Sequence, residues 1–517
     1  MSFWVDTQTI TGSVCRYLAT WRRSSHLAMR GVACAAAVSL VAHAAHAQQM
    51  PGDSQPPAQI HYKGLTLSPV GYFAAEAVWR EKNETADIGS SFNAIPFEGT
   101  TNAAMNEFRG SARQSRIGLL AEGKVDDTKL AGFWESDFLS SGISSNSNES
   151  NSYTLRIRQF WGRATLGDGW QFTAGQMWSL LTTNKSGIAT RQEFVPLTID
   201  AQYAAGFNWA RQFGVRIGKE LTHGVWFVAS AEEAQTTFTA HGSNNNFVLG
   251  QTGGSLLNST VNYSTDPLPD LIGKLVFEPG FGHYEIKVIG RELRDRVVDV
   301  TGIYGGTHNS QNYVGGVGVG AVWTANMTEE NGKKRSVVDF GISGLWGNGI
   351  GRYGTSQLSD ATVRPNGELA PIRAAQGLVS LETHPTRKLD IYGYAGAEYA
   401  YRTAFLNGTK GEGYGSPLLS VSACTVEFPP TGAFLPGAAG GASNVTGVTN
   451  PGCNADTRAI AQGNLGWWYR FYQGPAGAVA WGVQYSYTQR ATWSGAKGLD
   501  PRALDQMVFT SFRYYLP

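Results

Sequence analysis

The sequence contains few charged residues and, beyond its first 50 positions, no long hydrophobic run. Asp, Glu, Lys and Arg make up 16% of the 517 residues, whereas soluble proteins average roughly 25%. Cysteine is also scarce, with 4 residues in the whole chain. A transmembrane α-helix needs about 20 consecutive apolar residues. Because no such run follows the N-terminal region, the sequence excludes a bundle of membrane-spanning helices.

The N-terminal region has the three parts of a secretory signal. Basic residues between positions 16 and 30 precede a short apolar run over residues 31–42, and residues 45–47 read Ala-His-Ala. A positive segment, a short apolar segment and an Ala-x-Ala cleavage site are typical of a signal peptide, and the apolar run is too short for a membrane anchor. We therefore predict a signal peptide over residues 1–47, with translation starting at Met1 or Met29.

Loss of this signal leaves a nearly neutral chain. It removes four of the 41 basic residues and one of the 40 acidic residues, and a neutral chain gives no support to nucleic-acid binding. Cys15 and Cys34 leave with the signal, so Cys424 and Cys453 remain. An even pair of cysteines in an exported protein favours one disulfide, here within a long loop over residues 403–456. The alternative is two unpaired thiols.

The sequence is rich in glycine, with 64 residues, and in aromatic residues, at 12%. Residues 153–163 read YTLRIRQFWGR, in which Leu155 and Ile157 alternate with Arg156 and Arg158. Side chains of a strand point alternately to its two faces. The segment is therefore either a surface strand over a soluble core or a barrel strand with its apolar face in lipid and its arginines in a water-filled lumen.

About sixteen segments of this alternating kind follow one another, joined by connections that are short and long in turn. Short turns on one rim and long loops on the other are typical of an outer-membrane β-barrel. Strands in lipid must also close on themselves, because an open edge would leave backbone groups unpaired. We predict an all-β, antiparallel up-and-down transmembrane barrel over residues 66–517, preceded by a short periplasmic segment over residues 48–65. The expected strands cover 66–79, 107–122, 130–138, 153–163, 169–179, 207–218, 224–235, 270–278, 283–297, 313–325, 335–346, 375–384, 388–402, 457–472, 477–491 and 505–516.

Aromatic residues near strand ends are candidates for the girdles at the two membrane surfaces. They are Trp79, Trp161, Trp323, Trp346, Trp467, Trp468 and Trp481.

Several segments resemble the DcaP-like trimeric porins of proteobacterial outer membranes. The resemblance is densest over residues 107–218, and its motifs include SARQSRIGLLAEG (111–123), GFWESDF (132–138) and GWQFTAGQMWSL (169–180). It implies a sixteen-stranded barrel, a homotrimer and a channel for small anionic solutes such as dicarboxylates. Some relatives carry an N-terminal coiled coil, whereas residues 48–65 are Pro-rich and have no heptads, so a trimer would be held by the barrel walls.

The charges that could act as a filter lie on three strands and in one loop. Residues 180–206 connect the fifth and sixth expected strands, where general porins fold a loop into the lumen, and opposite charges in a narrow lumen select solutes by charge and size. On the strands, the arginines are either an anion-selective ladder or members of a structural ion-pair network with the nearby carboxylates. The predicted constriction residues are Arg116, Glu135, Asp137, Arg156, Arg158, Lys185, Arg191, Glu193 and Asp200.

No pattern indicates catalysis, a metal site or a cofactor. The mature histidines stand singly, and the glycine-rich residues 313–323 lack the ending of a phosphate-binding loop, so they are better interpreted as a strand whose small face packs against another wall or subunit. The sequence therefore predicts a passive porin of the bacterial outer membrane that conducts small anionic solutes. The alternative is a surface-binding or adhesin barrel acting through its extracellular loops, a role for which the loop over residues 403–456 would be the recognition element.

Overall fold

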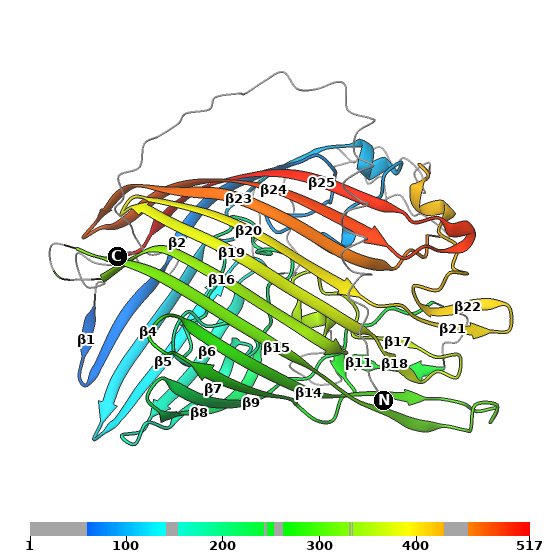
Figure 1. Cartoon of the computed structure of the whole chain (residues 1–517), viewed down its shortest axis with the longest axis horizontal. Coiled ribbons are helices and arrows are strands. Elements are labelled where there is room, and N and C mark those ends of the chain that lie inside the picture. Colours follow the sequence, from blue (N-terminus) through cyan, green and yellow to red (C-terminus); the bar gives the residue numbers. More distant parts are fainter. Residues whose placement is uncertain are drawn as a thin grey trace, which may run out of the picture. The chain divides into compact units, whose positions relative to one another are not determined.

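The computed structural model describes residues 59–140, 154–241, 246–252, 262–329, 332, 334–428 and 453–517. The predicted signal peptide and residues 48–58 lie outside the described residues. Sixteen antiparallel strands, one of them interrupted, close into a barrel that they cross at a slant (Figure 1). In order around the wall they are β2 (Leu65–Arg80), β3 (Glu107–Ser111) with β4 (Arg116–Val125), β5 (Thr128–Asp137), β6 (Arg156–Thr165), β7 (Gln171–Trp178), β8 (Arg211–Thr222), β9 (Val225–Glu232), β13 (Asp270–Phe277), β14 (His283–Val297), β15 (His308–Thr328), β16 (Lys334–Asn348), β19 (Arg373–Thr386), β20 (Leu389–Ala400), β23 (Thr457–Gly474), β24 (Gly477–Thr492) and β25 (Arg502–Tyr515).

The barrel closes at β2, which pairs with the last strand on one edge and with the second on the other. Residues Tyr72–Arg80 of β2 pair with β25, and Leu65–Tyr72 pair with β4 while the end of the strand pairs with β3. The sheet therefore closes on itself and has no open edge strand, as hydrocarbon requires. This confirms the predicted fold class.

The two faces of β6 separate as the alternation predicts. Leu155 and Ile157 are 49% and 50% exposed on the outside of the barrel, whereas the Arg158 side chain is 2% exposed on the inside. Large apolar side chains elsewhere on the wall, such as Leu381 and Leu465, are exposed in the same way. A belt of this kind is stable only against lipid, because in water it would be a large exposed apolar patch.

Short turns join the strands at one rim and long loops at the other, as predicted. β4 and β5 are separated by two residues, whereas β20 and β23 are separated by 56. Small elements at the barrel ends and in the long loops are β1 (Ile60–Tyr62), β10 (Phe247–Val248), β11 (Gly250–Thr252), β12 (Asn262–Ser264), β17 (Ala361–Val363), β18 (Leu369–Pro371), β21 (Thr403–Asn407), β22 (Lys410–Tyr414) and 3₁₀ turns at Phe92–Ala94, Thr101–Ala104, Gly351–Tyr353, Ser422–Thr425 and Ala496–Gly498. Within the described part of the chain, no helix is long and apolar enough to cross a membrane.

The predicted aromatic girdle is correct in part. Trp79, Trp346 and Trp481 are 40–49% exposed on the outer face. Trp161 and Trp468 instead point into the lumen and are 4% exposed, so their assignment to the girdle was wrong. For Trp161 the cause is a β-bulge at Arg158, where Glu135 pairs with Gln159 and the next residue, Ser136, pairs with Ile157. The extra residue inverts the alternation beyond it.

The predicted disulfide is present between Cys424 and Cys453, whose Cα atoms are 4.7 Å apart. Cys424 lies in the 3₁₀ turn Ser422–Thr425 and is fully buried. The bond joins two described segments of the long connection between β20 and β23. Residues 429–452, between the two cysteines, lie outside the described part of the chain.

The small face of residues 313–323 packs against another segment of the same barrel, inside the lumen. This stretch belongs to β15, and a Cβ added at Gly320 would lie 2.7 Å from Oγ1 of Thr183 and 3.1 Å from Oε2 of Glu285. Glycine therefore lets the chain segment at Thr183 approach the wall.

We expect Gly320→Val to lower the free energy of unfolding by about 1–3 kcal/mol, because it overpacks this contact. Gly290→Val is the matched control, since Gly290 lies on the outer face of β14 and an added Cβ would meet no atom within 4 Å. Denaturant unfolding of the refolded protein in detergent measures both. Equal stability of the two variants would contradict the contact.

Candidate pore constriction

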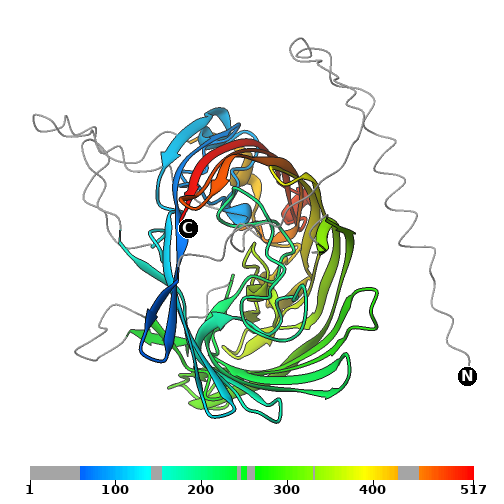
Figure 2. The same cartoon turned by 90° about the vertical axis from the view of Figure 1, so that its left-hand side faces the viewer.

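The segment between β7 and β8 lies inside the barrel. In Figure 2 this teal chain lies within the ring of strands. Side chains of the opposite wall hold its second half by accepting hydrogen bonds from the loop backbone. The N–H of Leu197 donates to the Tyr394 hydroxyl (2.7 Å). The N–H of Ile199 donates to Oε1 of Gln484 (2.6 Å), and the N–H of Gly206 donates to Oε1 of Glu398 (2.9 Å). The loop thus crosses the lumen and is fixed on the far side.

The first half of the loop is held by two fully buried lysines. Nζ of Lys274, on β13, and Nζ of Lys287, on β14, each donate 2.8 Å bonds to the loop carbonyls of Thr182 and Leu181, respectively. Both ammonium groups pair with Glu285, at 3.0 and 2.8 Å. A buried charge is tolerated only when it is paired and hydrogen-bonded. The loop carbonyls therefore help to stabilise the two buried ammonium groups.

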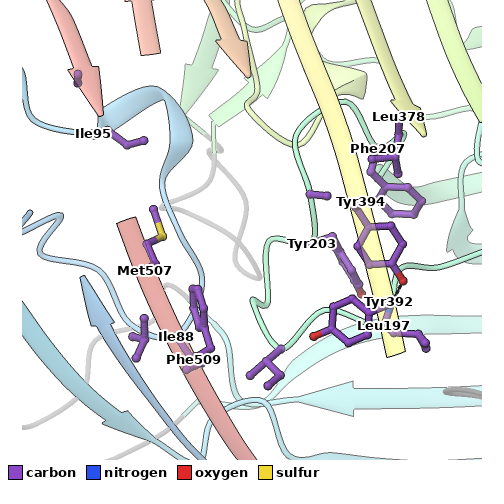
Figure 3. Close-up of a cluster of buried hydrophobic side chains, with 14 of the residues drawn as sticks. Ile88, Ile95, Leu197, Tyr203, Phe207, Leu378, Tyr392, Tyr394, Met507 and Phe509 are labelled. Atoms are coloured by element: carbon purple, nitrogen blue, oxygen red, sulfur yellow. Dashed lines mark hydrogen bonds between the residues drawn. The ribbon is translucent and has the colours of Figure 1, made fainter. Parts of the chain in front are cut away.

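Apolar side chains fill the space between the loop and the wall. Figure 3 shows Leu197, Tyr203 and Phe207 of the loop near Tyr392 and Tyr394 of β20. The first long connection contributes Ile88 and Ile95 to the same cluster, and β25 contributes Met507 and Phe509. This part of the lumen is therefore packed as a core, and a group of charged side chains lies beside it.

Those charged groups gather on β4, β5 and β6. Arg156 forms a bidentate pair with Asp137, at 2.9 and 2.7 Å. Arg158 donates to Glu135 (2.7 Å), to Asp137 (2.9 Å) and, through Nη2, to the hydroxyl of Tyr203 in the loop (2.9 Å). These two arginines therefore have the contacts of a structural ion-pair network.

Four other arginines near this network have no carboxylate partner among the described residues. Each guanidinium lies over an aromatic ring instead: Arg116 over Tyr72 (5.2 Å), Arg163 over Trp161 (5.5 Å), Arg191 over Phe133 (4.7 Å) and Arg211 over Trp178 (4.7 Å). All four side chains are partly exposed. The stacked rings orient the guanidiniums without neutralising them.

The structure brings Arg116, Glu135, Asp137, Arg156 and Arg158 together as one cluster, with Arg191 beside them. The remaining predicted residues lie elsewhere in the loop. Asp200 is fully buried and accepts hydrogen bonds from the backbone N–H groups of Ser90 (3.1 Å) and Gln202 (2.8 Å). Burial raises the pKa of Asp200 and of Glu193.

Lys185 points to a different wall. Its ammonium group pairs with Asp339 of β16, next to Glu382 and His384 of β19. Asp339, Glu382 and His384 lie close enough together to form a metal-ligand group. The two ring nitrogens of His384, however, contact Asp339 (3.3 Å) and Asp390 (2.8 Å). Glu382 accepts a hydrogen bond from the Tyr394 hydroxyl (2.6 Å), so each member of the group has a partner within the protein.

The sequence analysis missed Tyr203, Arg163 and Arg211. Tyr203 and Arg191 are the two loop residues other than glycine with a positive φ, at 70° each. Such a backbone costs about 1–3 kcal/mol and persists where the surroundings impose it. Strict alternation would have placed Arg163 on the lipid face, opposite Arg156, and only the bulge at Arg158 brings it inside. The position of Arg211 beside Arg158 depends on how the barrel closes.

Comparison with known proteins supports the fold. No protein-family model matches the sequence, and no curated protein is similar to it in sequence. Among solved structures, the outer membrane channel DcaP of Acinetobacter baumannii superposes with a TM-score of 0.58 at 16% identity, over 89% of this chain and 100% of that one. The anion-selective porin of Comamonas acidovorans covers 87% of this chain and 100% of its own, at 10% identity and a TM-score of 0.44. The barrel therefore has the fold of a porin-like outer-membrane channel, and the DcaP similarity is a similarity of fold.

Tyr203 gives the cluster a pH dependence. Burial raises the pKa of its phenol, but the nearby Arg158, Arg116 and Arg211 outweigh burial and lower the pKa to about 7. As the pH rises through this value the phenol loses its proton, and a negative charge forms among the arginines.

We expect the preference for anions over cations, measured as the reversal potential in a salt gradient, to fall as the pH rises through about 7. Tyr203→Phe should remove that component of the pH dependence and keep the low-pH value, because it deletes only the hydroxyl. A pH profile that is identical in the two proteins would contradict the assignment.

Proposed function

We propose that the chain is a porin of the bacterial outer membrane, exported through a signal peptide cleaved after Ala47, through which small hydrophilic anions such as dicarboxylates diffuse passively. One observation carries the choice of solute charge. Arg191 in the in-folded loop and Arg116, Arg163 and Arg211 on the wall beside it are partly exposed and have no carboxylate partner among the described residues. A guanidinium remains charged at all relevant pH values and forks onto carboxylates.

In this proposal the two groups of arginines have different roles. Arg156 and Arg158 are matched by Asp137 and Glu135, so they brace the wall and add little net field. The arginines stacked on aromatic rings supply the net positive potential of the lumen. Several weak sites in sequence allow an anion to enter and to leave, so Arg116 and Arg211 would act in turn on a passing solute.

We expect the double substitution Arg116→Gln and Arg211→Gln to shift the reversal potential toward cations, because it removes two positive charges without leaving a carboxylate unpaired. Lys129→Gln with Lys388→Gln is the matched control, since both lysines are exposed at the short-turn rim. Single-channel recording in planar bilayers, in a salt gradient, measures both variants. If the two double variants have the same selectivity, the arginines do not form the filter.

We also propose a homotrimer, on the basis of the resemblance to the DcaP-like porins. The outer face of β4–β7 supports this, because Ala121, Gly132, Gly162 and Ala174 lie side by side across four strands. They border a hollow of about 480 Å³. Small residues let two walls approach closely in a membrane.

Replacing Ala174 by Trp should convert a trimer into a monomer, since the new side chain fills the hollow. Native mass spectrometry of the protein in detergent measures the assembly, with Val215→Trp on the neighbouring strand as a second variant. A trimer that persists in both variants would place the interface on another face of the barrel.

A further inference from the structure

Three arginines lie at the long-loop rim of the barrel, with side chains that are exposed or partly exposed. Arg373 begins β19, Arg402 follows β20 and Arg458 is the second residue of β23. These strands are neighbours: the backbone N–H of Tyr401 donates to the carbonyl of Arg373 (2.8 Å), and Tyr399 pairs with Ala459. The three guanidiniums therefore share one level of the wall, which we call the arginine rim.

Aromatic rings support each guanidinium of the arginine rim. Arg373 lies over Trp346, at 5.6 Å, whereas Arg402 and Arg458 share Trp493, at 4.7 and 5.7 Å. The Trp346 ring is 49% exposed on the outer face. Aromatic rings in this position mark the depth of the lipid headgroups in a barrel.

The described residues provide no carboxylate within ion-pair distance of these three arginines. Their hydrogen bonds are with neutral groups: Arg373 donates to the side chain of Asn348 (3.4 Å) and Arg402 to the carbonyl of Ser494 (3.3 Å). Residues 429–452, which lie outside the described part of the chain, contain no Asp or Glu in their sequence. Three positive charges thus face the headgroup region without an anion from the described chain.

The wall below the arginine rim is apolar. Ala375 and Val379 of β19 and Ala397 of β20 face outward there, and Val379 is 43% exposed. A dissolved anion would use only the guanidiniums, whereas a lipid would use the guanidiniums and this surface together. Guanidiniums recognise phosphate through paired hydrogen bonds.

We propose that the arginine rim binds the phosphate groups of an anionic lipid of the outer leaflet, with its acyl chains along the outer face of β19 and β20. The site lies outside the lumen and is independent of solute passage. It makes the protein a specific partner of phosphorylated lipid on one side of the membrane.

The test uses the folded protein in nanodiscs of phosphatidylcholine, with or without diphosphorylated lipid A, and native mass spectrometry of the retained lipid. We expect each of Arg373→Gln, Arg402→Gln and Arg458→Gln to weaken lipid A binding about fivefold and the triple variant roughly a hundredfold, from about 1 kcal/mol per arginine near a charged surface. Single-channel conductance should not change. The single variants keep the test valid if the triple variant does not fold.

The matched control is Lys63→Gln with Lys129→Gln and Lys388→Gln, three exposed lysines at the short-turn rim, and it should retain lipid A like the unchanged protein. Equal loss in both triple variants, or no loss in either, would overturn the proposal. Adding inorganic phosphate as a competitor distinguishes a site for the phosphate of a lipid from a site for free phosphate. Displacement of lipid A by millimolar phosphate would indicate a site for a free anion and would also overturn the lipid assignment.

Discussion

Backbone hydrogen bonding in hydrocarbon is the constraint on which the structure depends. A chain without long apolar runs can cross a membrane only as strands, and strands in lipid must leave no edge unpaired. β2 meets this requirement by pairing with β25 over Tyr72–Arg80 and with β3 and β4 on its other edge. Closure in turn gives each strand a lipid face and a lumen face, to which successive side chains point alternately except at bulges such as the one at Arg158.

Within the closed wall, the loop between β7 and β8 fills part of the lumen. Its carbonyls bind the buried Lys274 and Lys287, and its side chains pack on Tyr392 and Tyr394. One part of the lumen thereby becomes a packed core. Ion pairs stabilise the remaining charged side through Arg156 and Arg158, while the arginines that lie on aromatic rings keep their charge available.

The strands were predictable because alternation is a local property. β14 has the predicted bounds, 283–297, and β19 and β20 differ from prediction by two residues or fewer at each end. Features that depend on closure were not predictable. A bulge at Arg158 turns Trp161 inward, and Lys185 pairs with Asp339, which lies 154 residues away along the chain. The sequence identifies the charged residues of the loop but does not show which of them lie at the charged cluster. In the folded loop Asp200 is buried, whereas Arg191 lies over Phe133 beside the cluster.

The most direct test of this account places a fluorescent label on either face of β6. Ile157→Cys and Arg156→Cys are compared in the mature chain, where the disulfide occupies the two native cysteines. The account predicts that the label at position 157 is quenched by nitroxide lipids and not by iodide, and that the label at position 156 behaves in the opposite way. A label at position 157 that neither quencher reaches would mean that this face is buried in protein, and the barrel would not span a membrane in this orientation.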